Sequence, residues 1–202
     1  GIPVDSDTTV EYDGSSWSEG GAMNTARRQT GSFGTQTAAV LVGGTTPNRN
    51  EVEEYNGSSW TSVNTMPNGR QQSTGAGIIS AGLVMSGSNP GIPNIGVLTE
   101  EYDGTNWTSG GTLNTGRAYQ AGFGILTAGL IVAGNANGSV TGATESYDGT
   151  SFATTASLGT GVMDGGGAGS STSGVFAGGG PTHSSRTEEF SVAATTRTVD
   201  VS

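Results

Sequence analysis

The chain has 202 residues and a formal net charge of −10, with 37 Gly, no Cys and no Lys. An acidic surface repels nucleic-acid backbones and anionic membranes, which excludes nucleic acid as a partner. The lack of Cys excludes disulfides, thiolate metal sites and cysteine nucleophiles, and no stretch approaches the ~20 apolar residues that a membrane-inserted helix needs.

The composition indicates an all-β fold in a single domain. Each Gly inside a helix costs roughly 1 kcal/mol relative to Ala, so long helices are not expected. The apolar residues instead form short clusters such as residues 38–42 and 129–132, which are typical of buried strands. A chain of this length can bury a core of its own.

In chain order, the first predicted element is a hairpin within residues 9–26 that carries Tyr12-Asp13-Gly14 and then Trp17. Four longer units follow, at about 27–69, 70–116, 117–161 and 162–202. Each unit begins with an Arg or Val, places Gly seven residues later and again ten further on, and predicts strands a and b between them. An aromatic, an Asp-Gly or Asn-Gly turn of the kind that fits a two-residue hairpin, and a second aromatic then predict strands c and d. The aromatic pairs of these units are Tyr55…Trp60, Tyr102…Trp107 and Tyr147…Phe152, with a degenerate copy at Glu188-Glu189-Phe190.

The first aromatic of each copy recurs every 43 to 47 residues. Repeats of this length cannot bury their apolar faces alone and must stack or close into a ring. The pattern therefore predicts a small β-propeller with four-stranded blades, four in number, with five as the alternative. Glycine and alanine in strand a fit the crowding near the axis of such a ring.

The repeats contain one surplus half-blade. Four a–b pairs begin near residues 27, 70, 117 and 162, but five c–d pairs begin near 9, 52, 99, 144 and 187. The intact Tyr12…Trp17 pattern favours a ring closed by the N-terminal strands. Alternatively, residues 187–202 complete the last blade, or the surplus half belongs to a blade shared with another protomer or to a longer array. Since the chain begins at Gly1 without Met, it is expected to be a fragment or a processed product.

The order of these motifs resembles the kelch repeat, in which a Gly pair closes the second strand, a Tyr follows on the third and a Trp on the fourth. The pairs are Gly43-Gly44, Ser86-Gly87, Ala133-Gly134 and Gly178-Gly179. Residues 100–117 are also similar to kelch-like arrays of predicted phage tail-fibre and structural proteins. The resemblance covers the chain from about Thr9 to Phe190 and implies a virion or extracellular location. Fold alone implies little about activity.

One Arg and one Glu recur in the units. The arginines are Arg27, Arg70 and Arg117, and the glutamates are Glu53, Glu100, Glu145 and Glu188. Their equivalent positions favour an Arg–carboxylate pair that locks the d–a corner of each blade. The alternative is a sialidase-like cluster of three arginines that grips a ligand carboxylate, in a glycan-processing enzyme. The repeated Tyr and Trp residues are interpreted as packing between blades.

No catalytic set is evident, and the chain is not predicted to be an enzyme. His183 is the only histidine, which excludes a cluster of His metal ligands within one chain. No cofactor or metal is expected.

The b–c connections vary while the rest of the repeat keeps one frame, which is typical of a scaffold that presents a recognition surface. We therefore expect a non-catalytic recognition or structural module that binds a host-surface glycan or protein through the face of the b–c and d–a loops. A homo-oligomer or contacts with other virion proteins are further expected partners, and a purely architectural subunit is the other alternative. The candidate ligand-binding residues are Asn48, Arg49, Asn89, Asn94, Asn137, His183 and Arg186.

Overall fold

The computed structural model describes residues 4–45, 49–92, 95–181 and 185–192. These residues form an all-β fold of small antiparallel sheets, with one 3-10 turn, η1 (Ile95–Val97), and no α-helix. None of the described segments is a helix long and apolar enough to cross a membrane.

Four sheets form the blades of a four-bladed β-propeller. The first blade contains β3 (Gly31–Thr35), β4 (Ala38–Val42), β5 (Val52–Tyr55) and β6 (Trp60–Ser62). The second contains β7 (Thr74–Ile78), β8 (Ala81–Met85), β9 (Thr99–Tyr102) and β10 (Trp107–Ser109). The third contains β11 (Ala121–Ile125), β12 (Ala128–Val132), β15 (Thr144–Tyr147) and β16 (Phe152–Thr155). The fourth contains β17 (Gly166–Ser170), β18 (Ser173–Ala177) and β19 (Thr187–Ser191). Two separate hairpins are formed by β1 (Val10–Tyr12) with β2 (Trp17–Glu19), and by β13 (Asn135–Ala136) with β14 (Ser139–Val140).

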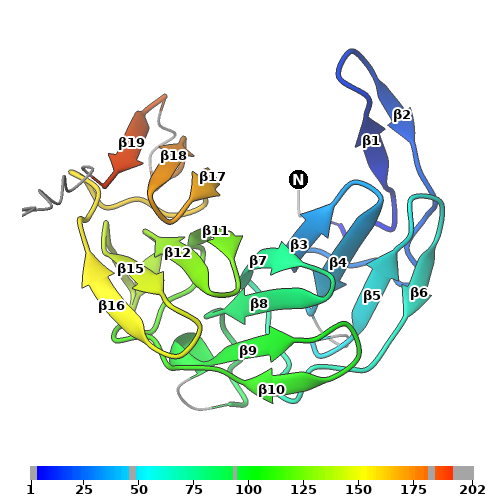
Figure 1. Cartoon of the computed structure of the whole chain (residues 1–202), viewed down its shortest axis with the longest axis horizontal. Coiled ribbons are helices and arrows are strands. Elements are labelled where there is room, and N and C mark those ends of the chain that lie inside the picture. Colours follow the sequence, from blue (N-terminus) through cyan, green and yellow to red (C-terminus); the bar gives the residue numbers. More distant parts are fainter. Residues whose placement is uncertain (1–3, 46–48, 93–94, 182–184, 193–202) are drawn as a thin grey trace, which may run out of the picture.

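The blades stand around a common centre, with β3, β7, β11 and β17 innermost (Figure 1). Large and small residues interlock where blades meet. A Cβ atom on Gly82 would lie 2.2 Å from the ring of Phe33, and one on Gly174 would lie 2.5 Å from the ring of Phe123. At each of these two contacts, a phenyl ring of one blade therefore occupies the space left by a glycine of the next blade, as close packing requires.

The Gly pair after the second strand turns the backbone twice through the left-handed region. The second residue has φ between 98° and 118° in all four blades, which disfavours any side chain, and it is Gly each time. The first residue has φ between 62° and 75°, and here the chain also uses Ser86 and Ala133. The strict and the degenerate half of the motif thus follow from the backbone angles.

The Asp-Gly and Asn-Gly turns join strands c and d through four residues, whereas the sequence pattern predicts a two-residue hairpin. In the first blade, Tyr55 pairs with Trp60. The side-chain oxygen of Asn56 accepts hydrogen bonds from the backbone N–H groups of Ser58 and Ser59, both at 3.0 Å. The polar side chain therefore closes a longer loop, as Asx turns do.

The N-terminal strands do not complete the fourth sheet, contrary to the sequence-based expectation. Instead, β19 pairs with β18, and Phe190 lies opposite Gly174. The β1–β2 hairpin packs beside the first blade, where Trp60 donates a hydrogen bond to Thr9 at 2.8 Å. A strand that follows β18 closely along the chain closes a shorter loop than one from the N-terminus, and this favours β19. Figure 1 shows the hairpin and the fourth blade at opposite ends of the row of blades.

Candidate functional site

The three repeated arginines are internal parts of the blades. Arg70 is fully buried and forms an ion pair with Glu100 at 2.9 Å, while its Nη1 donates to the carbonyl oxygens of Ser86 and Leu98. Arg27 with Glu53 and Arg117 with Glu145 form the same ion pairs. Burial lowers the pKa of the Arg70 guanidinium, and Glu100 opposes that effect. The predicted Arg–carboxylate lock is confirmed, and the arginines are not exposed for a ligand carboxylate.

The fourth unit lacks this ion pair, because Val162 replaces the Arg. Its Glu188 is bound instead by Arg186, with a distance of 2.6 Å from Nε to the carboxylate. Arg186, one of the predicted ligand-binding residues, is thus engaged by Glu188, and its carbonyl oxygen accepts a hydrogen bond from the backbone N–H of Gly178 at 2.8 Å.

Of the other predicted binding residues, the structure describes Arg49, Asn89 and Asn137, and no hydrogen bond or ion pair joins any two of these described residues. Asn48, Asn94 and His183 lie outside the described residues. Arg49 accepts a hydrogen bond from Arg70 through its carbonyl oxygen at 2.6 Å. Asn89 donates to the carbonyl oxygen of Gly69 at 2.6 Å. Asn137 is exposed in the β13–β14 turn.

Asn137 and Asn135 line a hollow of about 370 Å³ beside Gly87 and Ala118. Of the predicted residues within the described part of the chain, Asn137 is the one that combines exposure with a lined hollow. The remaining described ones stabilise loops.

A different set of residues forms a cavity of about 270 Å³ at the axis, where the four innermost strands begin. It lies on the face of the d–a and b–c connections, since each of its segments directly precedes an inner strand. All four blades contribute two residues to it. These are Gln29, Thr30, Gln72, Ser73, Tyr119, Gln120, Asp164 and Gly165.

The first residue of each pair has a left-handed backbone, although none of them is Gly. The φ angles are 59° for Gln29, 56° for Gln72, 61° for Tyr119 and 59° for Asp164. Such a conformation costs about 1–2 kcal/mol in a residue with a side chain. Because four equivalent positions bear the same cost, interactions with a structural or functional role are expected to offset it.

A chain of hydrogen bonds between adjacent blades offsets part of this backbone strain. Gln72 donates its backbone N–H to the carbonyl of Gln29 at 2.7 Å, and Asp164 donates to that of Tyr119 at 2.9 Å. Tyr119 reaches the carbonyl of Gln72 at 3.4 Å. The side chains join in, since Gln72 donates from Nε2 to the Tyr119 hydroxyl at 2.6 Å. Adjacent blades are thereby tied together at the axis, and the polar side chains are held around the cavity.

The sequence pattern did not predict these axial residues, because the repeat is defined by its constant positions and they occupy a variable one. The axial residues occupy the second position after Arg27, Arg70, Arg117 and Val162, and there the repeats read Gln, Gln, Tyr and Asp. Variation at one position inside a constant frame is the signal that could have found it. Amides, a phenol and a carboxylate at one mouth can form directed hydrogen bonds to a polar ligand.

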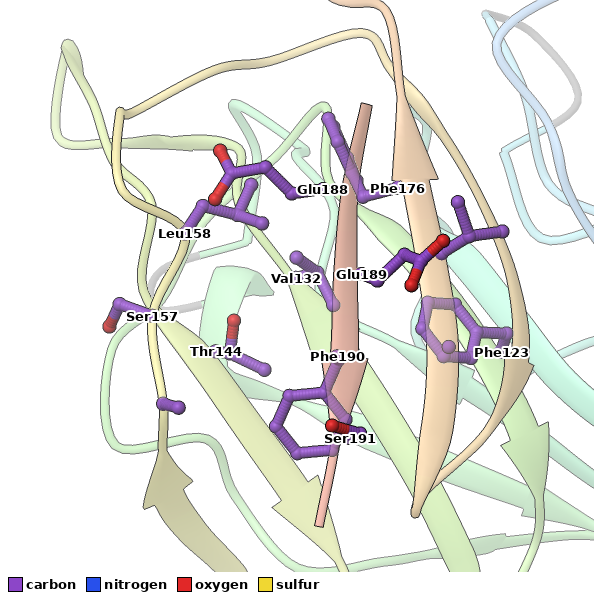
Figure 2. A pocket seen from close by; sticks show the side chains of 13 residues that line it. Phe123, Val132, Thr144, Ser157, Leu158, Phe176, Glu188, Glu189, Phe190 and Ser191 are labelled. Atoms are coloured by element: carbon purple, nitrogen blue, oxygen red, sulfur yellow. The ribbon is translucent and has the colours of Figure 1, made fainter. Parts of the chain in front are cut away.

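A second cavity of about 190 Å³ lies between the third and fourth blades, with Phe123, Val132 and Phe190 among its walls (Figure 2). In the other blades the third-strand aromatic lies against a fourth-strand aromatic, with ring centroids 4.5 to 5.0 Å apart. The described residues of the fourth blade include no such partner for Phe190. The cavity is therefore the space that an aromatic fills elsewhere, and we assign it to packing.

Comparisons with known proteins support the fold. A solved structure titled "Structure of YjhT" is similar to this chain with a TM-score of 0.68 and 17% sequence identity. The similarity covers 88% of this chain and 73% of the other. No family model matches the chain. No curated protein matches it either.

Proposed function

We propose that the protein is a non-catalytic recognition module that binds a glycan at the axial cavity, on the face of the d–a and b–c connections. The observation that carries this proposal is the ring of variable, left-handed polar residues, Gln29, Gln72, Tyr119 and Asp164, set in an otherwise constant frame. A sugar presents many hydroxyl groups, which match amide, phenol and carboxylate partners. The Tyr119 ring adds an apolar surface on which a sugar can stack.

The charge of the axial cavity limits the classes of glycan that it can bind. The cavity contains Asp164 and no cationic side chain among its lining residues, and the whole chain carries a net charge of −10. An anionic sugar would therefore be repelled, so a neutral or amine-bearing glycan is favoured. The kelch-like repeat and the likeness of residues 100–117 to predicted phage fibre proteins suggest that the glycan lies on a host surface and that the module belongs to a virion fibre.

A glycan array followed by calorimetric titration of the best neutral glycan tests the proposal. Asp164→Ala alters an exposed side chain and is expected to weaken binding at least tenfold, which corresponds to the loss of about 1.4 kcal/mol from one hydrogen bond to a charged group. Ser58→Ala, in an exposed c–d turn away from the axis, is the matched control and should bind like the unaltered protein.

Binding that both variants retain in full would refute the axial site. Preferential binding of sialylated glycans would contradict the charge argument. A host protein captured without any glycan signal would instead support the protein ligand that the sequence left open.

A further inference from the structure

Neighbouring blades share a repeated contact made by the tyrosine of the third strand. The hydroxyl of Tyr102 donates to Glu54 of the preceding blade at 2.6 Å, and its ring lies 6.4 Å from that of Phe33, centroid to centroid. Tyr147 repeats the contact with Glu101, within the cluster that holds Ala76 and Leu83. Each tyrosine thus covers a small apolar patch of the previous blade and ends on its carboxylate.

The contact between the third and fourth blades lacks both the tyrosine hydroxyl and the glutamate. In the fourth blade Phe190 replaces the tyrosine, and in the third blade Ser146 stands where the others have the accepting glutamate. Phe190 still packs against the cluster that contains Phe123 and Leu130. The hydroxyl and the carboxylate are absent together, which is the expected result if each serves only the other.

The N-terminal hairpin and the fourth blade, at the two ends of the row of blades, each carry one half of this contact without its partner. The hairpin carries the tyrosine. Tyr12, the tyrosine of the N-terminal hairpin, is 48% exposed, and its hydroxyl donates to the carbonyl of its own Gly14 at 2.9 Å. Trp17, 5.1 Å away between ring centroids, is 69% exposed. In the complete blades the equivalent tyrosines are buried.

The fourth blade shows the complementary surface. Ala168, Val175 and Glu189 occupy the positions that Ala76, Leu83 and Glu101 hold in the second blade, and they line a hollow of about 420 Å³. Val175 is 38% exposed, whereas Leu83 is fully buried. Within the described residues, the side-chain carboxylate of Glu189 has no hydrogen bond or ion pair. Figure 2 shows Glu189 on β19 next to Glu188 and Phe190.

We propose that the hollow formed by Ala168, Val175 and Glu189 is a docking site for a second copy of this chain, whose Tyr12 packs on Val175 and donates its hydroxyl to Glu189. The second copy is the occupant because it carries the one exposed tyrosine that is built to make this contact. The chain's own hairpin is held at the first blade, where Tyr55 donates to Glu11. The contact is heterologous, so each added copy leaves one donor end and one acceptor end available.

This inference does not depend on glycan binding, because its two surfaces lie at the ends of the row of blades and not at the axis. It adds an assembly role to the recognition module. A contact centred on one tyrosine is small, so the association is expected to be weak and to depend on protein concentration.

Sedimentation velocity over a range of protein concentrations tests the proposal. The average mass of the unaltered chain should rise with concentration, and Val175→Asp should remain monomeric throughout. Tyr12→Phe keeps the ring and should raise the dissociation constant about tenfold, since a hydrogen bond to a charged group is lost. Ile125→Asp introduces the same charge at another exposed apolar residue, away from both ends, and should associate like the unaltered chain.

Cross-linking identifies the partners, and the absence of native Cys makes the result clean. Tyr12→Cys mixed with Glu189→Cys should give a disulfide-linked heterodimer, which neither variant forms with Ile125→Cys. The proposal is overturned if the unaltered chain stays monomeric, if Val175→Asp and Ile125→Asp behave alike, or if a chain that carries both Cys substitutions cross-links only within itself. Circular dichroism confirms that each variant is folded.

Discussion

Arg70 shows how much structure a single buried charge organises. It contacts the carbonyl oxygens of Asn68, Ser86 and Leu98 and the carboxylate of Glu100, so it joins three segments of one blade. Arg70→Met preserves much of the volume but leaves Glu100 as a buried charge without its partner. We expect the free energy of unfolding to fall by about 3–5 kcal/mol, measured by urea denaturation.

The matched control is Arg28, whose ion pair with Asp5 at 3.0 Å is 37% exposed on each side. Arg28→Met should cost less than about 1 kcal/mol, because water screens exposed pairs. The paired variant Arg70→Met with Glu100→Gln should recover part of the loss, since no uncompensated charge remains. Equal losses from Arg28→Met and Arg70→Met would contradict the role assigned to burial.

Tyr147 is expected to make the stability of the fold depend on pH in the alkaline range. Burial and the hydrogen bond to Glu101 raise its pKa from the ordinary 10.0 to about 12. A group whose pKa is raised on folding stabilises the protein below its unfolded-state pKa, and this contribution disappears as the pH rises toward the folded-state value. The stability advantage of the unaltered chain over Tyr147→Phe should therefore shrink between about pH 10 and pH 12. Unfolding curves at several pH values measure it, and an advantage that grows over this interval would contradict the assignment.

At the scale of the element, the strands and turns depend on backbone angles that the repeat motif encodes. Gly134 has φ of +109°, and a Cβ there would lie 2.8 Å from the carbonyl oxygen of Ala118. Gly134→Ala should therefore destabilise the protein by at least about 1 kcal/mol. Ala133→Gly, one residue earlier, should be nearly neutral, because the first and fourth blades already have Gly there. Thermal unfolding of the two variants compares them, and similar melting temperatures would refute the distinction.

The strands were predictable from the sequence because their signals are local. Apolar runs, paired glycines and the Tyr…Trp turn identified the four-stranded order, and the Arg–Glu lock followed from the equivalent positions of its two residues in each repeat. Ring closure was predicted wrongly, since the N-terminal hairpin carries the intact pattern and the segment around Phe190, which does pair with β18, carries a degenerate one. Local periodicity cannot say which of two like strands β18 will accept.

The axial cavity was not predicted from the sequence, for a related reason. Its residues lie one repeat apart along the chain and meet only through the ring. Their left-handed backbone has no composition signal, because Gln29, Tyr119 and Asp164 are not glycines. The loop residues predicted in their place are polar and variable, but the contacts of Asn89 and Arg186 show that such residues also stabilise the loops that carry them.

At the scale of the whole molecule, stability is expected to decline from the middle blades to the ends, because each blade in a repeat array is stabilised by its neighbours. The second blade has a neighbour on both sides, and four of the five residues of β8 are buried. The fourth blade has Val162 in place of the Arg of the lock, and four of the five residues of β17 are exposed. Its inner strands should open without unfolding of the rest.

Hydrogen–deuterium exchange followed by mass spectrometry measures this gradient. Amides of β17 and β18 should exchange faster than those of β7 and β8, since local opening of an end blade exposes less apolar surface than opening of a middle one. The experiment should use dilute Val175→Asp protein, so that no second copy covers the end of the row. Equal protection of the second and fourth blades in that variant would show that the first and fourth blades support each other directly. Protection of β18 that appears only in concentrated unaltered protein would instead be the mark of a docked second copy.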